Sequence, residues 1–493
     1  MKYYMGIDIG GTMVKACIFN DAGVLMATGS MTTPVCVVGN QHERDMTVLE
    51  ECIYSVIGKA ISRFNHDPSA IACIGCTGHG KGLYLLDQNK KYIRPAIAST
   101  DARAYEIVDQ WVNSGIEKES KKHTLQPLLA CQPAALLRWL KEEEPDHYAK
   151  IGYVLSAKDY IRFLLTDEVY AEESDSSGTA LLNLSQRCFD RELFRLYGIE
   201  ELYEKMPPLK CCTDICGFVT QKAQEKTGLL AGTPVCGGMF DIDACALACG
   251  DLSSRDISVV TGTWSINQYP SEEFATKERS TKVSLYCDGK RYLLEESSPT
   301  SAGNLEWCLS TLFPGMDYKE ADSVVSSFKA TDCSVVFTPF LYGCIEGTET
   351  ATFSGLTMDS KKEELLRAVY EGVAFAHRVH IERLQKSDST KKCLKVTGGA
   401  AKSDVWMQLF ANITGMEVVT VASKESGALG AAIAASVAVD AYSDLSVASK
   451  NMTKPARCFL PNLKEYAAYQ DKYECFKKLM KLNTKEGTEC TSN

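Results

Sequence analysis

The sequence predicts an α/β protein built from two domains of similar topology. Its 493 residues exceed the size at which a single hydrophobic core stops growing, so two or three domains are expected. Apolar runs of strand length alternate with segments of helical periodicity along the chain. A strand, a small turn with Gly and Thr, and a second strand open both halves, at 3–19 and again at 256–269. We interpret 1–248 and 249–493 as two copies of one architecture.

Strands and helices are predicted to alternate through the first half. Residues 3–9 and 14–19 are apolar runs around a Gly-Gly-Thr turn, which predicts a hairpin. Residues 47–65 carry an apolar stripe at helical spacing. By the same criteria we expect further strands at 24–28, 71–77, 83–87, 92–98 and 151–156, and helices at 104–114, 134–143, 160–165 and from about 240.

The second half repeats this alternation, and a hinge is expected near 246–256. Strands are predicted at 256–260, 264–269, 335–341 and 393–396, and helices at 362–384, 403–414 and 427–438. An amphipathic closing helix is predicted at 463–482, and the polar residues after 484 are expected to fray.

The overall charge excludes some partners. The formal net charge is −10 and the pI is about 5.4, which disfavours nucleic acid or an anionic membrane as the main partner. No uncharged stretch reaches the length of a membrane span, and no secretory leader is recognised. The 21 cysteines lack disulfide-like spacing, so we expect free, mostly buried thiols in a reducing cytoplasm.

Two further patterns are interpreted as packing. Cys73 and Cys76 match C-x-x-C, but residues three apart on a strand face opposite sides, which argues against a redox pair or a metal site. His377 and His380 lie three apart on a predicted helix without further ligands in view.

The first hairpin carries the residues of a phosphate clamp. Asp8 interrupts an apolar run, where an ionised carboxylate is costly unless a cation or a water-filled cleft receives it. Gly10 and Gly11 allow a sharp turn whose N–H groups can face an anion. Thr12 adds a donor and Lys15 a positive charge, while Asp8 can hold a hydrated Mg²⁺. An ordinary hairpin would leave Asp8 unexplained.

A second constellation follows Gly237 and Gly238. A strand leads into these two glycines and then into a helix whose first turn contains Asp241. The helix N-terminus favours the ionised carboxylate, so Asp241 is expected to be a competent base at neutral pH. The alternative is that Asp241 and Asp243 merely complement the helix terminus, which is the favoured interpretation for Asp243.

Five motifs in order resemble the FGGY carbohydrate kinases over nearly the whole chain. They are Gly6-x-Asp8-x-Gly10-Gly11-Thr12, Gly237-Gly238-x-x-Asp241, Thr261-Gly262-Thr263-Trp264, Thr397-Gly398-Gly399-Ala400-Ala401-Lys402-Ser403 and Gly427-x-x-Gly430-Ala431-Ala432. Within the family, four segments resemble kinases that act on L-xylulose: Glu43-Arg44-Asp45-Met46, Gly80-Lys81-Gly82-Leu83, Leu137-Arg138-Trp139-Leu140-Lys141 and Ser298-Pro299-Thr300-Ser301-x-Gly303-Asn304-Leu305-Glu306-Trp307.

The resemblance implies two ribonuclease-H-like domains of the actin–hexokinase type, with ATP and sugar in the cleft between them. The N-terminal domain would hold the sugar and the catalytic base, and the C-terminal domain would bind ATP. Asp241 would take the proton from the attacking sugar hydroxyl, and Asp8 and Asp241 would lie at the Mg²⁺. The ATP-side positions implied are Gly10, Gly11, Thr12, Lys15, Gly262, Thr263, Gly398, Gly399 and Ala400.

The implied sugar-side residues, besides Asp241, are His79, Asp101 and Arg103. Gly75 to Lys81 spells G-x-x-x-x-G-K, but Gly82 stands where a P-loop has Ser or Thr, and a predicted strand follows, so a P-loop is rejected. A structural histidine is the alternative for His79, and an exposed salt bridge is the alternative for Asp101 and Arg103. The role of Lys81 is left open.

The expected activity is ATP-dependent phosphorylation of a ketopentose at a terminal hydroxyl, with L-xylulose favoured. D-Xylulose, ribulose or a polyol keeps the reaction and changes the sugar. An actin- or chaperone-like ATPase shares the hairpins but has no need of Asp241 facing a sugar pocket, and a silent sugar sensor has no need of the intact Asp8 and Asp241. Dimers are common among such kinases, so a homodimer is also expected from the resemblance.

Overall fold

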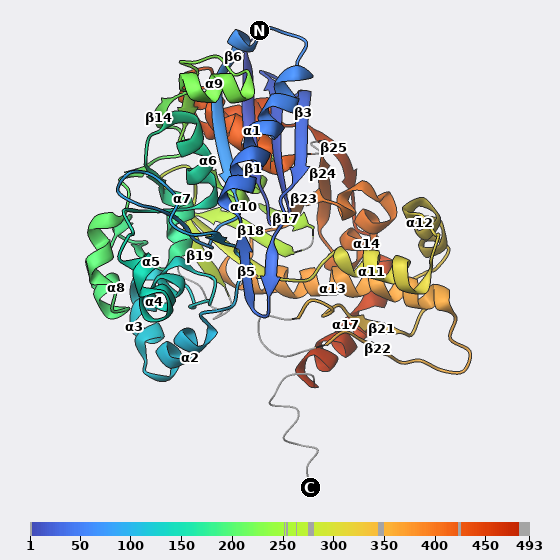
Figure 1. Cartoon of the computed structure of the whole chain (residues 1–493). Helices are drawn as coiled ribbons and strands as arrows, with labels where there is room; N and C mark the ends of the chain where they lie inside the picture. Colours follow the sequence, from blue (N-terminus) through green and yellow to red (C-terminus); the bar gives the residue numbers. More distant parts are fainter. Residues whose placement is uncertain are drawn as a thin grey trace.

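Two seven-stranded sheets organise the part of the chain that the computed structural model describes, residues 2–250, 252, 255–262, 264–274, 281–343, 350–422 and 425–482 (Figure 1). The first sheet has the order β14 (Ile215–Phe218), β15 (Pro234–Cys236), β6 (Ile71–Gly78), β1 (Tyr3–Ile9), β2 (Met13–Asn20) and β3 (Leu25–Thr32), with β16 (Met239–Phe240) also paired to β6. The second has the order β19 (Lys282–Leu285), β20 (Tyr292–Ser298), β18 (Ser265–Ser271), β17 (Asp256–Thr261), β23 (Cys393–Gly398), β24 (Glu417–Val421) and β25 (Pro455–Phe459).

Alternation along β1 assigns its residues to two faces. Tyr3, Met5, Ile7 and Ile9 pack in one core with α1 (Met46–Ser62) and α6 (Ala157–Thr166). The residues between them face the other side, because side chains alternate along a strand. Asp8 belongs to this second set and therefore faces α15 (Ser426–Ala438).

Helix α15 packs closely against the first sheet through glycines. A Cβ built on Gly6 would lie 1.8 Å from the carbonyl oxygen of Ala428, and one on Gly75 would lie 2.1 Å from that of Ala431. Only a residue without a side chain permits this approach. Gly430 of α15 lies in the same way against Ala244 of α10 (Asp241–Leu247). Helix α10 also contacts β17 and β18, so α10 and α15 lie between the two sheets.

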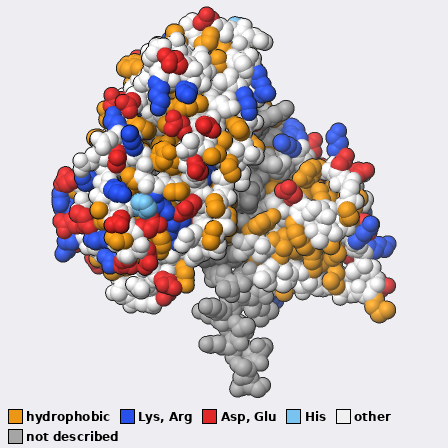
Figure 2. Space-filling view, in the orientation of Figure 1, with side chains coloured by type: hydrophobic (Ala, Val, Ile, Leu, Met, Phe, Trp, Pro, Cys, Tyr) orange, Lys and Arg blue, Asp and Glu red, His pale blue; other side chains and the backbone are white. Residues whose placement is uncertain are grey.

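The second sheet is covered by helices that connect its strands and by the helix that follows its last strand. Helix α13 (Lys362–Ser387), α14 (Asp404–Thr414), α11 (Gly303–Leu312) and α17 (Leu463–Leu482) contribute to one large core. The remaining helices are α12 (Tyr318–Ser326) and α16 (Leu445–Met452) in this half, and α2 (Tyr105–Asn113), α3 (Ile116–Thr124), α4 (Pro133–Glu143), α5 (Pro145–Tyr148), α7 (Glu173–Ser176), α8 (Arg191–Leu196) and α9 (Gln221–Thr227) in the first. Acidic and basic side chains are interspersed over the lobe formed by α2 to α5 and α8 (Figure 2).

Short strands make up the rest of the described β structure. They are β4 (Cys36–Val38), β5 (Gln41–Arg44), β7 (Tyr84–Leu86), β8 (Ala96–Ile97), β9 (Tyr153–Leu155), β10 (Ala171–Glu172), β11 (Leu182–Asn183), β12 (Cys188–Phe189), β13 (Leu209–Lys210), β21 (Val336–Thr338) and β22 (Thr352–Ser354). No described helix has both the length and the apolar character that a membrane crossing requires.

Most predicted elements are confirmed, with differences at their ends. The two hairpins, the strand at 71–77 and the helices at 362–384 and 463–482 form where the patterns placed them. The strand predicted at 92–98 shrinks to β8, because it is held mainly by its pairing to β5. The predicted fraying after 484 lies outside the described residues.

The cysteine and histidine patterns are packing, as predicted. Cys73 and Cys76 are free, buried thiols. His377 hydrogen-bonds to Ser265 and Ser301 in the core.

Candidate active site

The ends of three strands bring Asp8 and Asp241 to the same edge of the first sheet. Asp8 on β1 pairs in register with Thr77 of the parallel strand β6. On the other side of β6, Thr77 pairs with Met239 of β16, and the Thr77 hydroxyl donates to the Met239 carbonyl at 2.9 Å. Asp241 follows β16 directly and begins α10. The two carboxylates, 233 positions apart in the numbering, therefore flank one strand end.

Both carboxyl groups have a raised pKa, and the proximity of Asp8 contributes to that of Asp241. Burial raises the pKa of Asp8 to about 6, against the opposing field of Lys15. Burial raises the pKa of Asp241 well above its ordinary value, and Asp8 and Asp175 raise it further. The expectation that the helix N-terminus keeps Asp241 readily ionised is wrong in direction. Its backbone hydrogen bond to Ile242 lowers the pKa, but desolvation and two neighbouring carboxylates outweigh it.

The turn of the first hairpin presents its backbone at the surface. The Gly10 N–H donates to the Met13 carbonyl at 2.9 Å, and the Thr12 carbonyl accepts from the Thr33 N–H at 2.9 Å. Gly11 and Thr12 are exposed at this bend. Lys15 donates to Glu425 at 2.6 Å, which joins β2 to the residue preceding α15. The predicted phosphate lysine thus holds an ion pair between the two halves of the molecule.

Arg44 holds this turn through hydrogen bonds to its backbone carbonyls. We did not predict Arg44 as a site residue. It ends β5, is 1% exposed, and its Nη2 donates to the carbonyls of Gly10, at 3.1 Å, and Gly11. Its positive charge also lowers the pKa of His79. The only sequence signal was its place in a segment typical of L-xylulose kinases.

The second hairpin and the 398–400 turn meet at the end of the second sheet. Thr261 pairs with Gly398, and the Gly399 N–H donates to the Thr261 carbonyl at 2.9 Å. Gly398 has φ 100°, and a Cβ there would lie 2.6 Å from the Thr261 carbonyl oxygen, so glycine is required. Gly262 accepts from the Ala302 N–H at 3.0 Å, and Ala400 begins a short 3₁₀ helix. Thr263 lies outside the described residues.

His79 lies just past the end of β6 and is buried. Its backbone N–H donates to the Ile9 carbonyl at 2.9 Å, and its Nε2 lies 3.3 Å from the Tyr84 hydroxyl. Burial lowers the pKa of His79 to about 3, so its imidazole is neutral. A neutral imidazole acts as a hydrogen-bonding group and carries no charge at physiological pH.

Asp101 and Arg103 form an ion pair. The pair is buried, whereas the alternative interpretation was a solvent-exposed salt bridge. Arg103 donates to Asp101 from Nε at 3.0 Å and from Nη2 at 2.9 Å, and the His42 N–H donates to Asp101 at 2.6 Å. Arg103 also lies 2.8 Å from Glu43 and 4.9 Å from the centre of the Trp139 ring. These contacts connect the 101–103 segment to β5, which carries Arg44.

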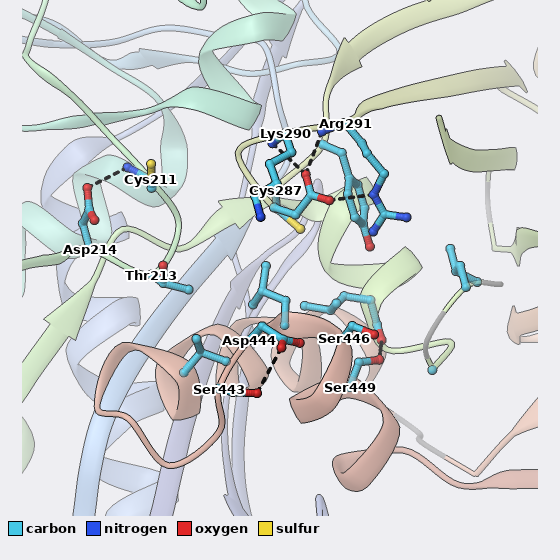
Figure 3. Close-up of a pocket in the computed structure, with 17 residues that line it drawn as sticks. Cys211, Thr213, Asp214, Cys287, Lys290, Arg291, Ser443, Asp444, Ser446 and Ser449 are labelled. Carbon is cyan, nitrogen blue, oxygen red and sulfur yellow. Dashed lines mark hydrogen bonds and ion pairs between the residues drawn. The ribbon is translucent and has the colours of Figure 1, made fainter. Parts of the chain in front are cut away.

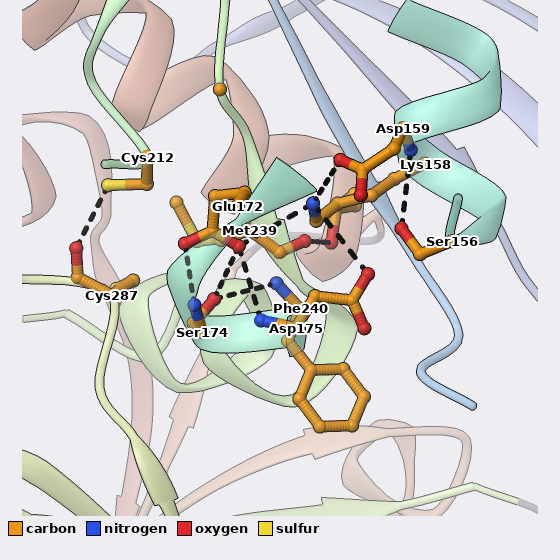
Figure 4. Close-up of polar contacts among 12 residues, drawn as sticks. Ser156, Lys158, Asp159, Glu172, Ser174, Asp175, Cys212, Met239, Phe240 and Cys287 are labelled. Carbon is orange, nitrogen blue, oxygen red and sulfur yellow. Dashed lines mark hydrogen bonds and ion pairs between the residues drawn. The ribbon is translucent and has the colours of Figure 1, made fainter. Parts of the chain in front are cut away.

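A buried ionic cluster contacts Phe240, the residue that precedes Asp241, and no sequence pattern predicted it (Figure 4). The Lys158 Nζ lies 2.7 Å from Asp159, 3.5 Å from Glu172 and 3.6 Å from Asp175, and all four side chains are almost fully buried. The Ser174 hydroxyl donates to Glu172 at 2.8 Å and accepts from the Phe240 N–H at 3.1 Å. The cluster therefore fixes the backbone immediately before Asp241.

Comparison with known proteins identifies the family. Residues 3–248 match the N-terminal domain of the FGGY family of carbohydrate kinases, and residues 257–439 match its C-terminal domain. The chain belongs to the FGGY family of carbohydrate kinases. It is therefore a sugar kinase, and this membership implies ATP as the phosphoryl donor.

Several relatives of this FGGY kinase match along almost their whole length. A probable L-xylulose kinase of Pasteurella multocida is 38% identical over 97% of this chain and 98% of its own. The L-xylulose/3-keto-L-gulonate kinase of Escherichia coli is 36% identical over 97% of both chains. The crystal structure of xylulose kinase from Lactobacillus acidophilus, at 24% identity, superposes with a TM-score of 0.91 over 99% of this chain and 100% of its own. The predicted two-domain α/β fold is confirmed.

The FGGY kinase also has a cavity of about 450 Å³ away from these residues (Figure 3). Its walls come from 211–214 of the first half and from 286–291 and 443–449 of the second. Asp243 lies beside it and accepts from the Cys287 N–H at 2.8 Å, which supports the structural interpretation of Asp243. None of the predicted site residues that the structure describes lines this cavity.

Proposed function

We propose that this FGGY kinase phosphorylates the terminal hydroxyl of a ketopentose, with L-xylulose as substrate and L-xylulose 5-phosphate as product. The observation that carries the proposal is the pairing of Asp8 and Asp241 across the end of β6. The names of relatives at 36–38% identity over nearly the full length support the choice of L-xylulose.

Asp241 is the proposed general base. The terminal hydroxyl oxygen of the sugar attacks the γ-phosphorus of ATP, its proton passes to Asp241, and the bond between the γ-phosphorus and the bridging oxygen breaks to release ADP. A dry cleft favours transfer to the sugar over transfer to water. The raised pKa of Asp241 makes its carboxylate more basic than an exposed one.

The other site residues bind and position. On the nucleotide side, Gly10, Gly11, Thr12, Gly262, Thr263, Gly398, Gly399 and Ala400 are proposed to contact ATP, with Lys15 at the edge of the hairpin. On the sugar side, His79 is proposed to hydrogen-bond the substrate. Asp101 and Arg103 are hydrogen-bonded to each other and are proposed to shape the wall of the pocket.

A magnesium ion fits the pair of carboxylates. The negative charge of Asp8 raises the pKa of Asp241, and a divalent cation between the two carboxylates would offset this repulsion. Mg²⁺ in kinases is held by one or two carboxylates, water and phosphate oxygens, which agrees with a two-carboxylate site. When bound, it would neutralise charge on the transferred phosphoryl group.

Further assignments follow from the same reasoning. We place the domain boundary between 248 and 249, at the start of the gap that separates the two family matches.

Free cysteines support a cytoplasmic location, and the acidic net charge argues against nucleic acid as a partner. A homodimer remains a prediction.

The proposal is tested by a panel of L-xylulose, D-xylulose, ribulose, polyols and glycerol with ATP and Mg²⁺, ranked by kcat/KM. We expect ATP turnover to depend strongly on sugar and to rank L-xylulose first. Turnover that is indifferent to every sugar would favour the ATPase alternative. Another sugar in first place would keep the kinase and change its substrate.

A further inference from the structure

Arg44 differs from the other buried arginines of the described residues because it has no carboxylate partner. Each of the other five pairs with an aspartate or a glutamate: Arg94, Arg103, Arg162, Arg367 and Arg378. Arg44 is 1% exposed and forms no ion pair with any residue that the structure describes. Its Nε and Nη1 also lack a hydrogen-bond acceptor there. A buried charge without compensation is costly, so we expect Arg44 to meet its counter-charge in a bound anion.

The remaining nitrogen of Arg44, Nη2, fixes two peptide groups in the turn of the first hairpin. It donates to the Gly10 carbonyl at 3.1 Å and also to the Gly11 carbonyl, so both carbonyls converge on one atom. A trans peptide is planar, and its C=O and N–H lie on opposite sides. The N–H groups of Gly11 and Thr12, which belong to these two peptides, therefore point away from Arg44.

The outer side of this turn is open to a ligand. The N–H groups of Gly11 and Thr12 have no hydrogen-bond acceptor among the described residues, and both residues are exposed. A Cβ on Gly11 would meet no atom within 4 Å. The Gly10 N–H, in contrast, is used inside the turn, where it donates to Met13 at 2.9 Å. Two neighbouring N–H groups with a guanidinium behind them form a favourable arrangement for an anion.

The strand that carries Arg44 is itself held in place. Arg44 ends β5 and pairs in register with Ala96 of β8. The preceding residue, Glu43, forms ion pairs with Arg94 and Arg103. Side chains alternate along a strand, so Glu43 and Arg44 face opposite sides of β5. Arg44 is therefore positioned before any ligand binds, and a preorganised donor needs no rearrangement during the reaction.

We propose that Arg44 is a positioning residue for the phosphate groups of ATP. It holds the Gly10 and Gly11 carbonyls inward, directs the N–H groups of Gly11 and Thr12 toward the phosphates, and supplies a positive charge that the phosphates compensate. This role rests on the proposed contact between the first hairpin and ATP, and it makes or breaks no covalent bond. Because phosphoryl transfer depends on such positioning and charge, loss of Arg44 weakens ATP binding and lowers kcat.

The test measures the dissociation constants of ATP with Mg²⁺ and of adenosine, without sugar, by calorimetry in the wild type and in Arg44→Gln, Arg44→Lys and Arg63→Gln. Arg63 is the matched control, an exposed arginine that donates to the Thr28 carbonyl of the same sheet at 2.8 Å. We expect Arg44→Gln to raise the dissociation constant of ATP about 10-fold or more and that of adenosine less than about 2-fold, because only ATP carries phosphates. Arg44→Lys keeps the charge and should recover part of the loss. Arg63→Gln should match the wild type.

The outcomes separate the role of Arg44 from the proposed function. An equal loss of affinity for ATP and adenosine in Arg44→Gln would overturn the role, because Arg44 would then support the fold in general, and so would unchanged affinity for both. A wild type that binds ATP but phosphorylates no sugar would refute the proposed function, whereas a loss confined to ATP in Arg44→Gln would still support Arg44. Thermal unfolding without nucleotide shows whether each variant is folded. If Arg44→Gln is not, the ratio of the two dissociation constants in Arg44→Lys decides, and a wild-type ratio there overturns the role.

Discussion

The proposed nucleotide side and the proposed sugar side of the site are built in different ways. The nucleotide side consists of two tight turns, at 10–12 and 398–400, that are closed by backbone hydrogen bonds between nearby residues or paired strands. The sugar side is assembled from side chains of distant segments, joined by buried ion pairs such as Lys158 with Glu172 and Arg103 with Glu43. The structure of the nucleotide side therefore depends on glycine and backbone conformation. The structure of the sugar side depends on the pairing of buried charges. Substitutions should therefore fail for different reasons on the two sides.

The largest stability effect is expected on the sugar side, from Lys158→Met. This change leaves Asp159, Glu172 and Asp175 buried without their shared cation. Removing one partner from a buried ionic group costs about 3–5 kcal/mol. Urea unfolding should show this loss, whereas Lys150→Met, at an exposed lysine of the same half, should be close to wild type. Equal stability of the two variants would contradict the account of the cluster.

The next effect separates packing from phosphate binding by comparing two glycines. Gly6→Ala places a Cβ 1.8 Å from the Ala428 carbonyl oxygen, so α15 must shift, at a cost of about 1–3 kcal/mol by analogy with overpacking. Gly11→Ala meets no atom within 4 Å and should unfold like wild type, but it should raise KM for ATP. Calorimetry and ATP titration would measure the two effects. An unstable Gly11→Ala with normal KM would reverse the assignment.

A smaller effect is expected in the pH profile. If Asp241 must be ionised, kcat/KM falls as the pH drops through its pKa, which burial, Asp8 and Asp175 hold well above the ordinary carboxyl range. Asp175→Asn removes a negative charge, lowers the pKa of Asp241 and should move the acid limb to lower pH. The pH dependence of kcat/KM for L-xylulose in Asp175→Asn measures this shift, and Asp146→Asn, at an exposed aspartate, is the control. A shift to higher pH would contradict the assignment.

The two sides also differ in how far the sequence predicts them. The hairpins and Asp8 could be predicted because glycine spacing and a carboxylate in an apolar run are local signals. Arg44 and the Lys158 cluster could not, since their role depends on which distant groups surround them after folding. Asp241 was predicted in the first turn of a helix and lies there, but the predicted direction of its pKa was wrong, because the helix terminus can be recognised in the sequence and the proximity of Asp8 and Asp175 cannot.

The most direct test of the central claim is the Asp241→Asn variant with L-xylulose, in which kcat and ATP binding are measured separately. Proton transfer to a positioned base contributes about two or more orders of magnitude. The account predicts a fall in kcat of about 100-fold or more, with the dissociation constant of ATP and the unfolding temperature close to those of the wild type. A kcat near the wild-type value would contradict the assignment of Asp241 as the base.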